Sequence, residues 1–392
     1  MVHTAVSLFV KFSCFGRRLL PMLNQQQVRD PIKVRSLFVP LDGTEWHERA
    51  ISYGLLLSEW FGSKLDLFFS LADVPPLTRH GEWRQRAHLS LQAGEDGRNL
   101  GESFINNGAI HEFGRILAID YLNEITNRLG HLNVEIETDL SAGSPAHILS
   151  YKAQQADDSM IVMYARPQHR LRRYIRKKMA EELLRVTTVP ILMINDDPDV
   201  ELRDIQLAPT SVVVPLRVEQ SMKACLPYAV AIAQKAGVGI RIYESNLDYR
   251  RNRKQFDQAR KYTFEYLDKI GIEYSIRSVR LGTTDTLAVA HRHSRFSWIV
   301  MGSRMRRGLT KRFLPSVADN IRREVSCPVL VVPQAETIPK RQAELNTWLV
   351  DWLAHQDSLP LHESRLPSHI QHRTLAQRFS SLYTYDESGS EK

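Results

Sequence analysis

Cysteine is scarce in this chain, with three residues among 392. Cys14, Cys225 and Cys327 lie far apart in the sequence, and no two of them form a CxxC pair. This spacing supports neither a disulfide framework nor a zinc site, and it fits a reducing compartment. We expect Cys225 and Cys327 to be small buried residues.

The sequence also lacks an apolar run of the roughly 18 residues that a membrane-spanning helix requires. The nearest candidate, residues 5–15, is interrupted by Lys11. Two arginines follow this stretch, whereas a signal peptide carries its basic residues before the apolar segment. We therefore expect a cytoplasmic protein with no membrane segment. We interpret residues 1–33 as an amino-terminal extension, for which Met22 offers an alternative start.

Signatures of common catalytic sites are missing as well. The chain contains no GxxxxGK[ST], HExxH or GxSxG pattern. His111 with Glu112, and His291 with His293, lack a third metal ligand at a useful spacing. Helix or loop surface explains these histidines better than a metal site does. The motif content thus gives little support to an enzyme.

The positive charge, by contrast, is concentrated in two places. The chain carries 52 Lys and Arg against 44 Asp and Glu, a formal charge of +8. Residues 164–178 contain seven basic and no acidic residues, and residues 302–312 contain five and none. Without these twelve residues, the chain has 40 basic and 44 acidic residues, so the rest of the chain is slightly acidic. Two basic loops therefore account for the surplus.

The chain also repeats itself. Residues 36–44 (SLFVPLDGT) align with residues 211–219 (SVVVPLRVE) at an offset of 175. Two later segments repeat at an offset of 138, residues 161–163 with 299–301 and residues 189–193 with 327–331. The first copy must therefore carry about 37 additional residues, which we place between 73 and 115, where Gly, Pro and Asn interrupt the periodicity.

Strand and helix patterns alternate in each copy. In the second copy, residues 298–301 and 329–332 are short apolar runs that bracket a basic loop and a helical pattern beginning near Ser316. This alternation predicts an α/β fold with a parallel sheet per copy and helices on both faces. In such a unit the loop after a strand leads into a helix amino terminus, where an anion is favoured.

The order of these segments resembles a tandem universal stress protein. The resemblance rests on the VPLDGT start, the GSPAHIL segment at residues 143–149 and the PVLVVP finish. It covers residues 34–195 and 209–334, with residues 196–208 as a linker. It implies two doubly wound domains with parallel five-stranded sheets and helices on both faces, of the adenine-nucleotide alpha-hydrolase-like class.

The same resemblance implies a regulatory or protective role in a stress response. It further implies pairing near the last strands, residues 191–194 and 329–332. One chain satisfies that pairing internally, as a pseudo-dimer, or two chains extend it by self-association.

ATP-binding members of this family carry Gly, two residues, Gly, nine residues, Gly, then Ser or Thr. In the second copy Gly302 and Ser316 match this motif, while Met305 and Pro315 replace the other two glycines. The family aspartate after the first strand is Asp42 in the first copy, and Arg217 stands there in the second. The resemblance thus implies ATP in the second copy, with these candidate residues: Gly302, Ser303, Arg304, Arg306 and Ser316, with Asp42 of the first copy.

Arginine offers phosphate a bidentate fork without a glycine cradle. The basic loop of the first copy is therefore a candidate anion site, consisting of Arg166, Arg170, Arg172, Arg173, Lys177 and Lys178. Slow ATP hydrolysis is the one enzyme hypothesis that we retain. The alternative is a scaffold that binds no nucleotide and whose basic loops bind nucleic acid or another polyanion. Two solvated basic faces explain the same pattern without a ligand.

The chain departs from the family pattern after residue 334. Five apolar side chains mark one face of an expected helix, namely Leu345, Trp348, Leu349, Trp352 and Leu353. This helix packs on its own domains or docks to a partner protein around Trp348 and Trp352. From about residue 358 the composition, rich in His, Ser and Pro, predicts a disordered tail.

Overall fold

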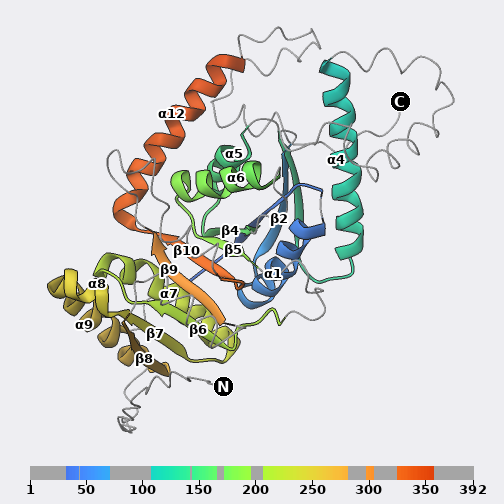
Figure 1. Cartoon of the computed structure of the whole chain (residues 1–392). Helices are drawn as coiled ribbons and strands as arrows, with labels where there is room; N and C mark the ends of the chain where they lie inside the picture. Colours follow the sequence, from blue (N-terminus) through green and yellow to red (C-terminus); the bar gives the residue numbers. More distant parts are fainter. Residues whose placement is uncertain are drawn as a thin grey trace, which may run out of the picture. The chain divides into compact units, whose positions relative to one another are not determined.

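Ten strands follow one another across a single sheet in the order β3-β2-β1-β4-β5-β10-β9-β6-β7-β8 (Figure 1). We analysed a computed structural model, which describes residues 32–43, 45–70, 107–141, 144–165, 172–195, 206–280, 297–303 and 325–356. The elements of the first copy are β1 (Ser36–Leu41), α1 (Glu45–Phe61), β2 (Lys64–Ser70), α4 (Asn107–Leu129), β3 (Ile136–Ser141), α5 (Pro145–Gln155), β4 (Ser159–Tyr164), α6 (Arg172–Val186) and β5 (Ile191–Ile194). Those of the second copy are β6 (Ser211–Pro215), α7 (Glu219–Ala236), β7 (Ile240–Ser245), α8 (Asn246–Arg251), α9 (Arg253–Ile270), β8 (Tyr274–Val279), β9 (Ser297–Ser303) and β10 (Val329–Pro333), followed by α12 (Ile338–Gln356).

The five strands of each copy run parallel to one another, as the sequence predicts. The two copies meet where β5 pairs with β10 in the antiparallel direction, with Leu192 opposite Leu330. The two expected five-stranded sheets are therefore the halves of one sheet. Because β5 and β10 are antiparallel, the carboxyl ends of the strands lie on opposite edges of the sheet in the two copies.

Alternation of side chains along the strands supplies a core on each face. On β1, Leu37 and Val39 join one hydrophobic cluster, and Phe38, which points the other way, joins a second. Helices α1, α4, α7 and α9 cover the first cluster, whereas α5, α6 and α12 cover the second. The predicted doubly wound α/β architecture is confirmed by these two helical layers.

Trp298 on β9 ties the two copies together from within the first cluster. It is 1% exposed, and its ring centroid lies 5.9 Å from that of Tyr53 and 5.8 Å from that of Trp60, both on α1 of the first copy. The indole Nε1 donates a hydrogen bond to the Leu207 carbonyl at 3.0 Å. One continuous core thus spans both copies.

Several sequence predictions can be compared with these elements. Cys225 and Cys327 are buried free thiols, as expected. The expected carboxyl-terminal helix is α12, and its Leu345 and Trp348 pack on the chain itself. Helix α4 begins inside the expected insertion at residues 73–115. Most of that insertion, the amino-terminal extension up to residue 31, linker residues 196–205 and the tail from residue 357 lie outside the described residues.

Candidate functional site

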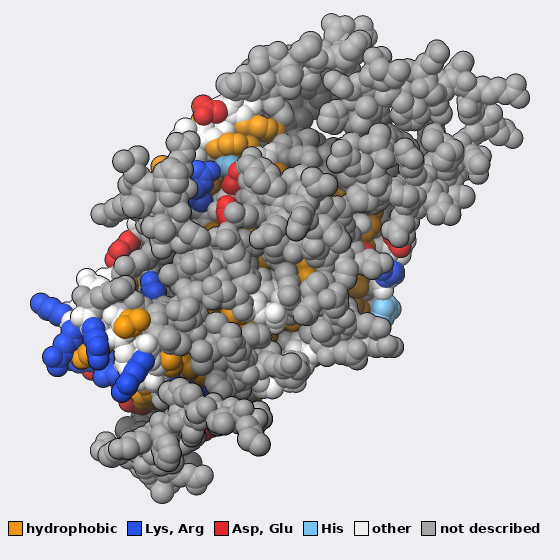
Figure 2. All heavy atoms as spheres, viewed as in Figure 1, with side chains coloured by type: hydrophobic (Ala, Val, Ile, Leu, Met, Phe, Trp, Pro, Cys, Tyr) orange, Lys and Arg blue, Asp and Glu red, His pale blue; other side chains and the backbone are white. Residues whose placement is uncertain are grey.

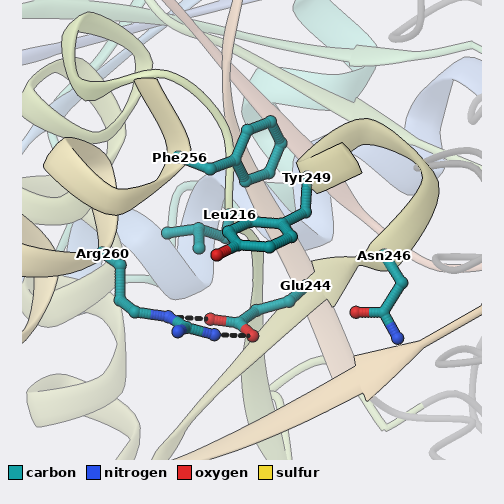
Figure 3. A pocket seen from close by; sticks show the side chains of 6 residues that line it. All are labelled: Leu216, Glu244, Asn246, Tyr249, Phe256 and Arg260. Atoms are coloured by element: carbon teal, nitrogen blue, oxygen red, sulfur yellow. Dashed lines mark hydrogen bonds and ion pairs between the residues drawn. The ribbon is translucent and has the colours of Figure 1, made fainter. Parts of the chain in front are cut away.

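A small cavity lies at the carboxyl ends of β6 and β7 in the second copy (Figure 3). In a parallel α/β sheet this edge is where ligands bind, because loops and helix amino termini converge there. The cavity encloses about 130 Å³. Its lining consists of Leu216, Glu244, Asn246, Tyr249, Phe256 and Arg260. Leu216 follows β6 and Glu244 belongs to β7, while the helices α8 and α9 supply the other four.

A buried carboxylate forms one wall of this cavity. Arg260 donates from Nε to Oε1 of Glu244 at 2.8 Å and from Nη2 to Oε2 at 2.5 Å. The Ser278 hydroxyl donates to the same Oε2 at 2.8 Å. The Glu244 side chain is 6% exposed and that of Arg260 is 43% exposed. Because both carboxylate oxygens already accept hydrogen bonds, Glu244 is engaged in joining β7, β8 and α9.

Aromatic and amide groups form the remaining wall. The guanidinium carbon of Arg260 lies over the Tyr249 ring, 6.0 Å from the ring centroid. The Tyr249 and Phe256 rings meet edge to face, with their centroids 6.4 Å apart. Figure 3 shows no hydrogen bond or ion pair from Asn246 or Tyr249 to the other labelled residues. An aromatic face beside an amide with a donor and an acceptor is suited to a planar ring that also forms hydrogen bonds.

Gly302 lies at the end of β9, where the chain has no room for a side chain. A Cβ at this position would lie 2.7 Å from the Ser221 carbonyl oxygen and 2.8 Å from the Ser221 Cα. Helix α7 therefore approaches β9 as closely as it does because residue 302 is glycine. The next residue, Ser303, accepts a hydrogen bond on Oγ from Arg341 Nη2 at 3.1 Å.

The corresponding edge of the first copy holds Asp42, directly after β1. Its Oδ1 lies 3.2 Å from Nδ1 of His47 in the first turn of α1, and both side chains are largely buried. The His47 ring in turn lies 6.2 Å from that of Tyr164, the last residue of β4. Asp42 is thus engaged with a histidine of its own copy.

Comparison with known proteins places this fold. A sequence profile of the universal stress protein family matches residues 33–195 and 243–333, more than half of the chain. The chain belongs to the universal stress protein family. Among solved structures, this universal stress protein is similar to one from Archaeoglobus fulgidus DSM 4304, with a TM-score of 0.56, 16% identity, and coverage of 78% of this chain and 98% of the other. It is also similar to a functionally unknown protein from Pseudomonas aeruginosa PAO1, with a TM-score of 0.51, 15% identity, and coverage of 80% and 98%.

These structural similarities support the fold alone. No protein in a search of curated sequences matches this universal stress protein. Within the described ranges, no three His, Cys, Asp or Glu residues gather as a metal site. No helix in the described part of the chain is long and apolar enough to cross a membrane.

The structure separates two of the candidate residues predicted from the sequence. Asp42 and Gly302 end strands of different copies, so they lie at opposite edges of the sheet and do not share a site. Ser303 follows Gly302 and contacts Arg341. Arg304, Arg306, Ser316, Arg166 and Arg170 lie outside the described residues, as do the side chains of four α6 residues, Arg172, Arg173, Lys177 and Lys178.

Sequence reasoning missed the cavity. Its residues belong to no motif, and the repeat does not reveal them because Phe69 is the first-copy counterpart of Glu244 at the offset of 175. One usable signal was present, since Glu244 has the same strand periodicity as the apolar Ile240 and Ile242, and a glutamate on an inward-facing position calls for a buried partner.

Proposed function

We propose that this universal stress protein is a regulatory binding protein that recognises an adenine nucleotide at the carboxyl edge of its second copy. The observation that carries the proposal is the cavity between Leu216, Asn246 and Tyr249, which combines an aromatic face, an amide and an apolar floor. Its volume of about 130 Å³ suits a single ring system. Pockets that hold a whole small ligand commonly have about 300–1,000 Å³.

The phosphates would then interact with residues beyond Ser303. The basic run at 304–312 and the Ser316 hydroxyl follow directly in the chain and supply the charge that phosphate requires. Binding without rapid turnover is the activity favoured here, because Glu244, the one carboxylate among the described residues that line the cavity, accepts hydrogen bonds on both oxygens from Arg260 and Ser278. A general base needs a free lone pair directed at its proton.

Calorimetric titration of ATP, ADP and GTP into the full chain tests this proposal. Tyr249→Ala and Asn246→Ala are each expected to weaken ATP binding about 5- to 100-fold, from the loss of stacking or of an amide hydrogen bond. A combined Arg304→Ala, Arg306→Ala, Ser316→Ala variant should weaken ATP and ADP more than adenosine. Gln255→Ala, exposed on α9, is the matched control. ATP binding that is unchanged in Tyr249→Ala and Asn246→Ala, or no heat at millimolar ATP, would refute the proposal.

Polyanion binding is the second candidate function, and the concentration of charge in two runs favours it. The runs begin next to β4 and β9, whose carboxyl ends lie at opposite edges of the sheet. Each run would therefore bind its own anionic segment. Binding of single-stranded nucleic acid that weakens steeply between 50 and 200 mM salt, with no response to ATP, would favour this function over the first.

A further inference from the structure

Helix α12 follows the second copy in sequence but packs against the first. Oε1 of Glu344 forms an ion pair with Nη1 of Arg185 on α6, at 2.8 Å. Trp348 stacks on His147 of α5, with ring centroids 4.5 Å apart and an angle of 18° between the planes. Leu345 is fully buried between these contacts. From Arg341 to Trp348 the helix thus lies against the first copy, next to α5 and α6 (Figure 1).

The contact closest to β10 is made by a buried arginine. Arg341 is 1% exposed, and its Nη1 donates to the carbonyl oxygens of Leu184 at 2.9 Å and Thr187 at 2.8 Å. These carbonyls end α6, where the helix dipole favours a cation. Nη2 of the same guanidinium donates to Ser303 Oγ of the second copy at 3.1 Å. One planar group therefore bonds both copies at once.

Little else satisfies this charge. Among the described residues, Nε of Arg341 has no hydrogen-bond partner, and the nearby Glu344 carboxylate, whose charge opposes the effect of burial, is paired with Arg185. Burial lowers the pKa of Arg341 to about 10, so the guanidinium stays charged at neutral pH. A buried charge with so few partners depends strongly on each one, because a lost hydrogen bond leaves a desolvated donor. The carbonyls of α6 and the hydroxyl of Ser303 are therefore linked through their shared donor.

Buried polar groups also hold the Ser303 end of this connection. Gln334 donates from its backbone N–H to the Ser303 carbonyl at 3.3 Å. Its side-chain amide donates to the Ser221 hydroxyl, and both residues are almost fully buried. Ser221 is the residue against which Gly302 packs. The end of β9 is therefore fixed between α7 on one side and α12 on the other.

We propose that Arg341 couples the two copies, so that a change at the end of β9 in the second copy alters the stability of the end of α6 and of α12. Ser303 lies at the start of the basic run of the second copy, residues 302–312, and α6 carries basic residues of the first. The coupling therefore joins the two elements that carry the candidate anion sites. Its response to a nucleotide rests on the proposed function, whereas the contact itself does not.

Hydrogen exchange on the full chain, read by mass spectrometry without ligand, tests the coupling. Ser303→Ala is expected to accelerate exchange about threefold to tenfold at residues 183–188 and 338–348, as loss of one hydrogen bond predicts. Arg341→Lys, which keeps the charge but not the fork, should accelerate the same two segments. Thr347→Ala is the control, because within the described residues this hydroxyl donates to the Ala343 carbonyl of its own helix and to no group of the other elements. Exchange at residues 183–188 that is unchanged in both Ser303→Ala and Arg341→Lys overturns the coupling.

A second arm adds ATP to the wild type at a concentration that calorimetry shows to be saturating. If the nucleotide acts through this contact, ATP changes the exchange rates at residues 183–188. This ATP-induced change is expected to be at least about threefold smaller in Arg341→Lys. ATP that binds and leaves these residues unchanged overturns the ligand response. Failure of ATP to bind overturns the proposed function instead, and the ligand-free comparison of Ser303→Ala with wild type still decides the coupling.

Discussion

At the scale of single residues, Asp66 on β2 is the clearest case of a carboxyl group whose surroundings disfavour its charged form. It is 9% exposed, and its Oδ1 has no hydrogen-bond partner among the described residues. Burial, followed by the nearby Asp139 carboxylate, raises the pKa of Asp66 to about 7, while Lys152 and Lys64 oppose this rise and Glu137 adds to it. The folded protein therefore retains a proton that the unfolded chain releases near pH 4.

The sign of the resulting pH dependence follows from linkage. Because the folded pKa is higher than the unfolded one, Asp66 contributes stability below about pH 4 that is lost as pH rises to about 7. Asp66→Asn should remove this pH dependence. The unfolding free energy of the variant should therefore rise relative to that of the wild type as the pH increases from about 4 to about 7. Urea unfolding at several pH values measures the difference. Glu265→Gln, an exposed carboxylate on α9, should keep the wild-type slope; an unchanged slope in Asp66→Asn would contradict the argument.

Gly302 provides a second test at this scale. The sequence assigned it to a nucleotide motif, and the structure adds a packing reason, the close approach of Ser221. Gly302→Ala should lower the unfolding free energy by about 1–3 kcal/mol even without a ligand, because backbone atoms of α7 must move. Thermal unfolding of Gly302→Ala beside Gly130→Ala, whose nearest contact is 3.4 Å, measures this effect. Equal stability of the two variants would show that α7 adjusts freely.

At the scale of elements, β9 is anchored by Trp298 between two aromatic side chains of the other copy. Trp298→Ala should destabilise the protein by about 3–5 kcal/mol, since it removes a fully buried ring and leaves a cavity. Trp298→Phe should lower the unfolding free energy by less than half of this amount. Denaturant unfolding followed by circular dichroism gives both values. A loss confined to the second copy, seen as two separate transitions, would contradict the shared core.

The strands and most helices were predictable because their side-chain periodicity repeats in both copies. Val212, Val213 and Val214 read as a strand from sequence alone, and they are one. The contacts of α12 were not predictable in the same way. Nothing in the sequence around Arg341 indicates that its acceptors lie at residues 184, 187 and 303, since these depend on the packing of three elements. The cavity was missed for a similar reason, because Tyr249 and Arg260 meet Glu244 only once α8 and α9 have folded back on β7.

At the scale of the whole molecule, the pairing of β5 with β10 makes the two copies one folding unit. The described residues between Ile32 and Gln356 belong to a single compact unit. The sequence left open whether the last strands pair within or between chains, because strand patterns do not name their partners.

Separating the copies tests that unity. A chain of residues 32–208 would leave the edge of β5, four buried apolar residues, without β10. Such an edge pairs readily with another chain. We therefore expect the isolated first copy to dimerise or aggregate at micromolar concentration, whereas residues 32–356 unfold in one transition. Light scattering and calorimetry measure the two outcomes, and a stable monomeric first copy would contradict the expectation.

The opposite orientation of the two carboxyl edges has a consequence for how the copies diverge. Asp42 follows β1 and Arg217 follows the β6 strand, and these two strands are separated by four others and end at opposite edges of the sheet, so a substitution at one position does not contact the other. A duplicated domain joined in this way is free to keep one pocket and convert the other to a different ligand.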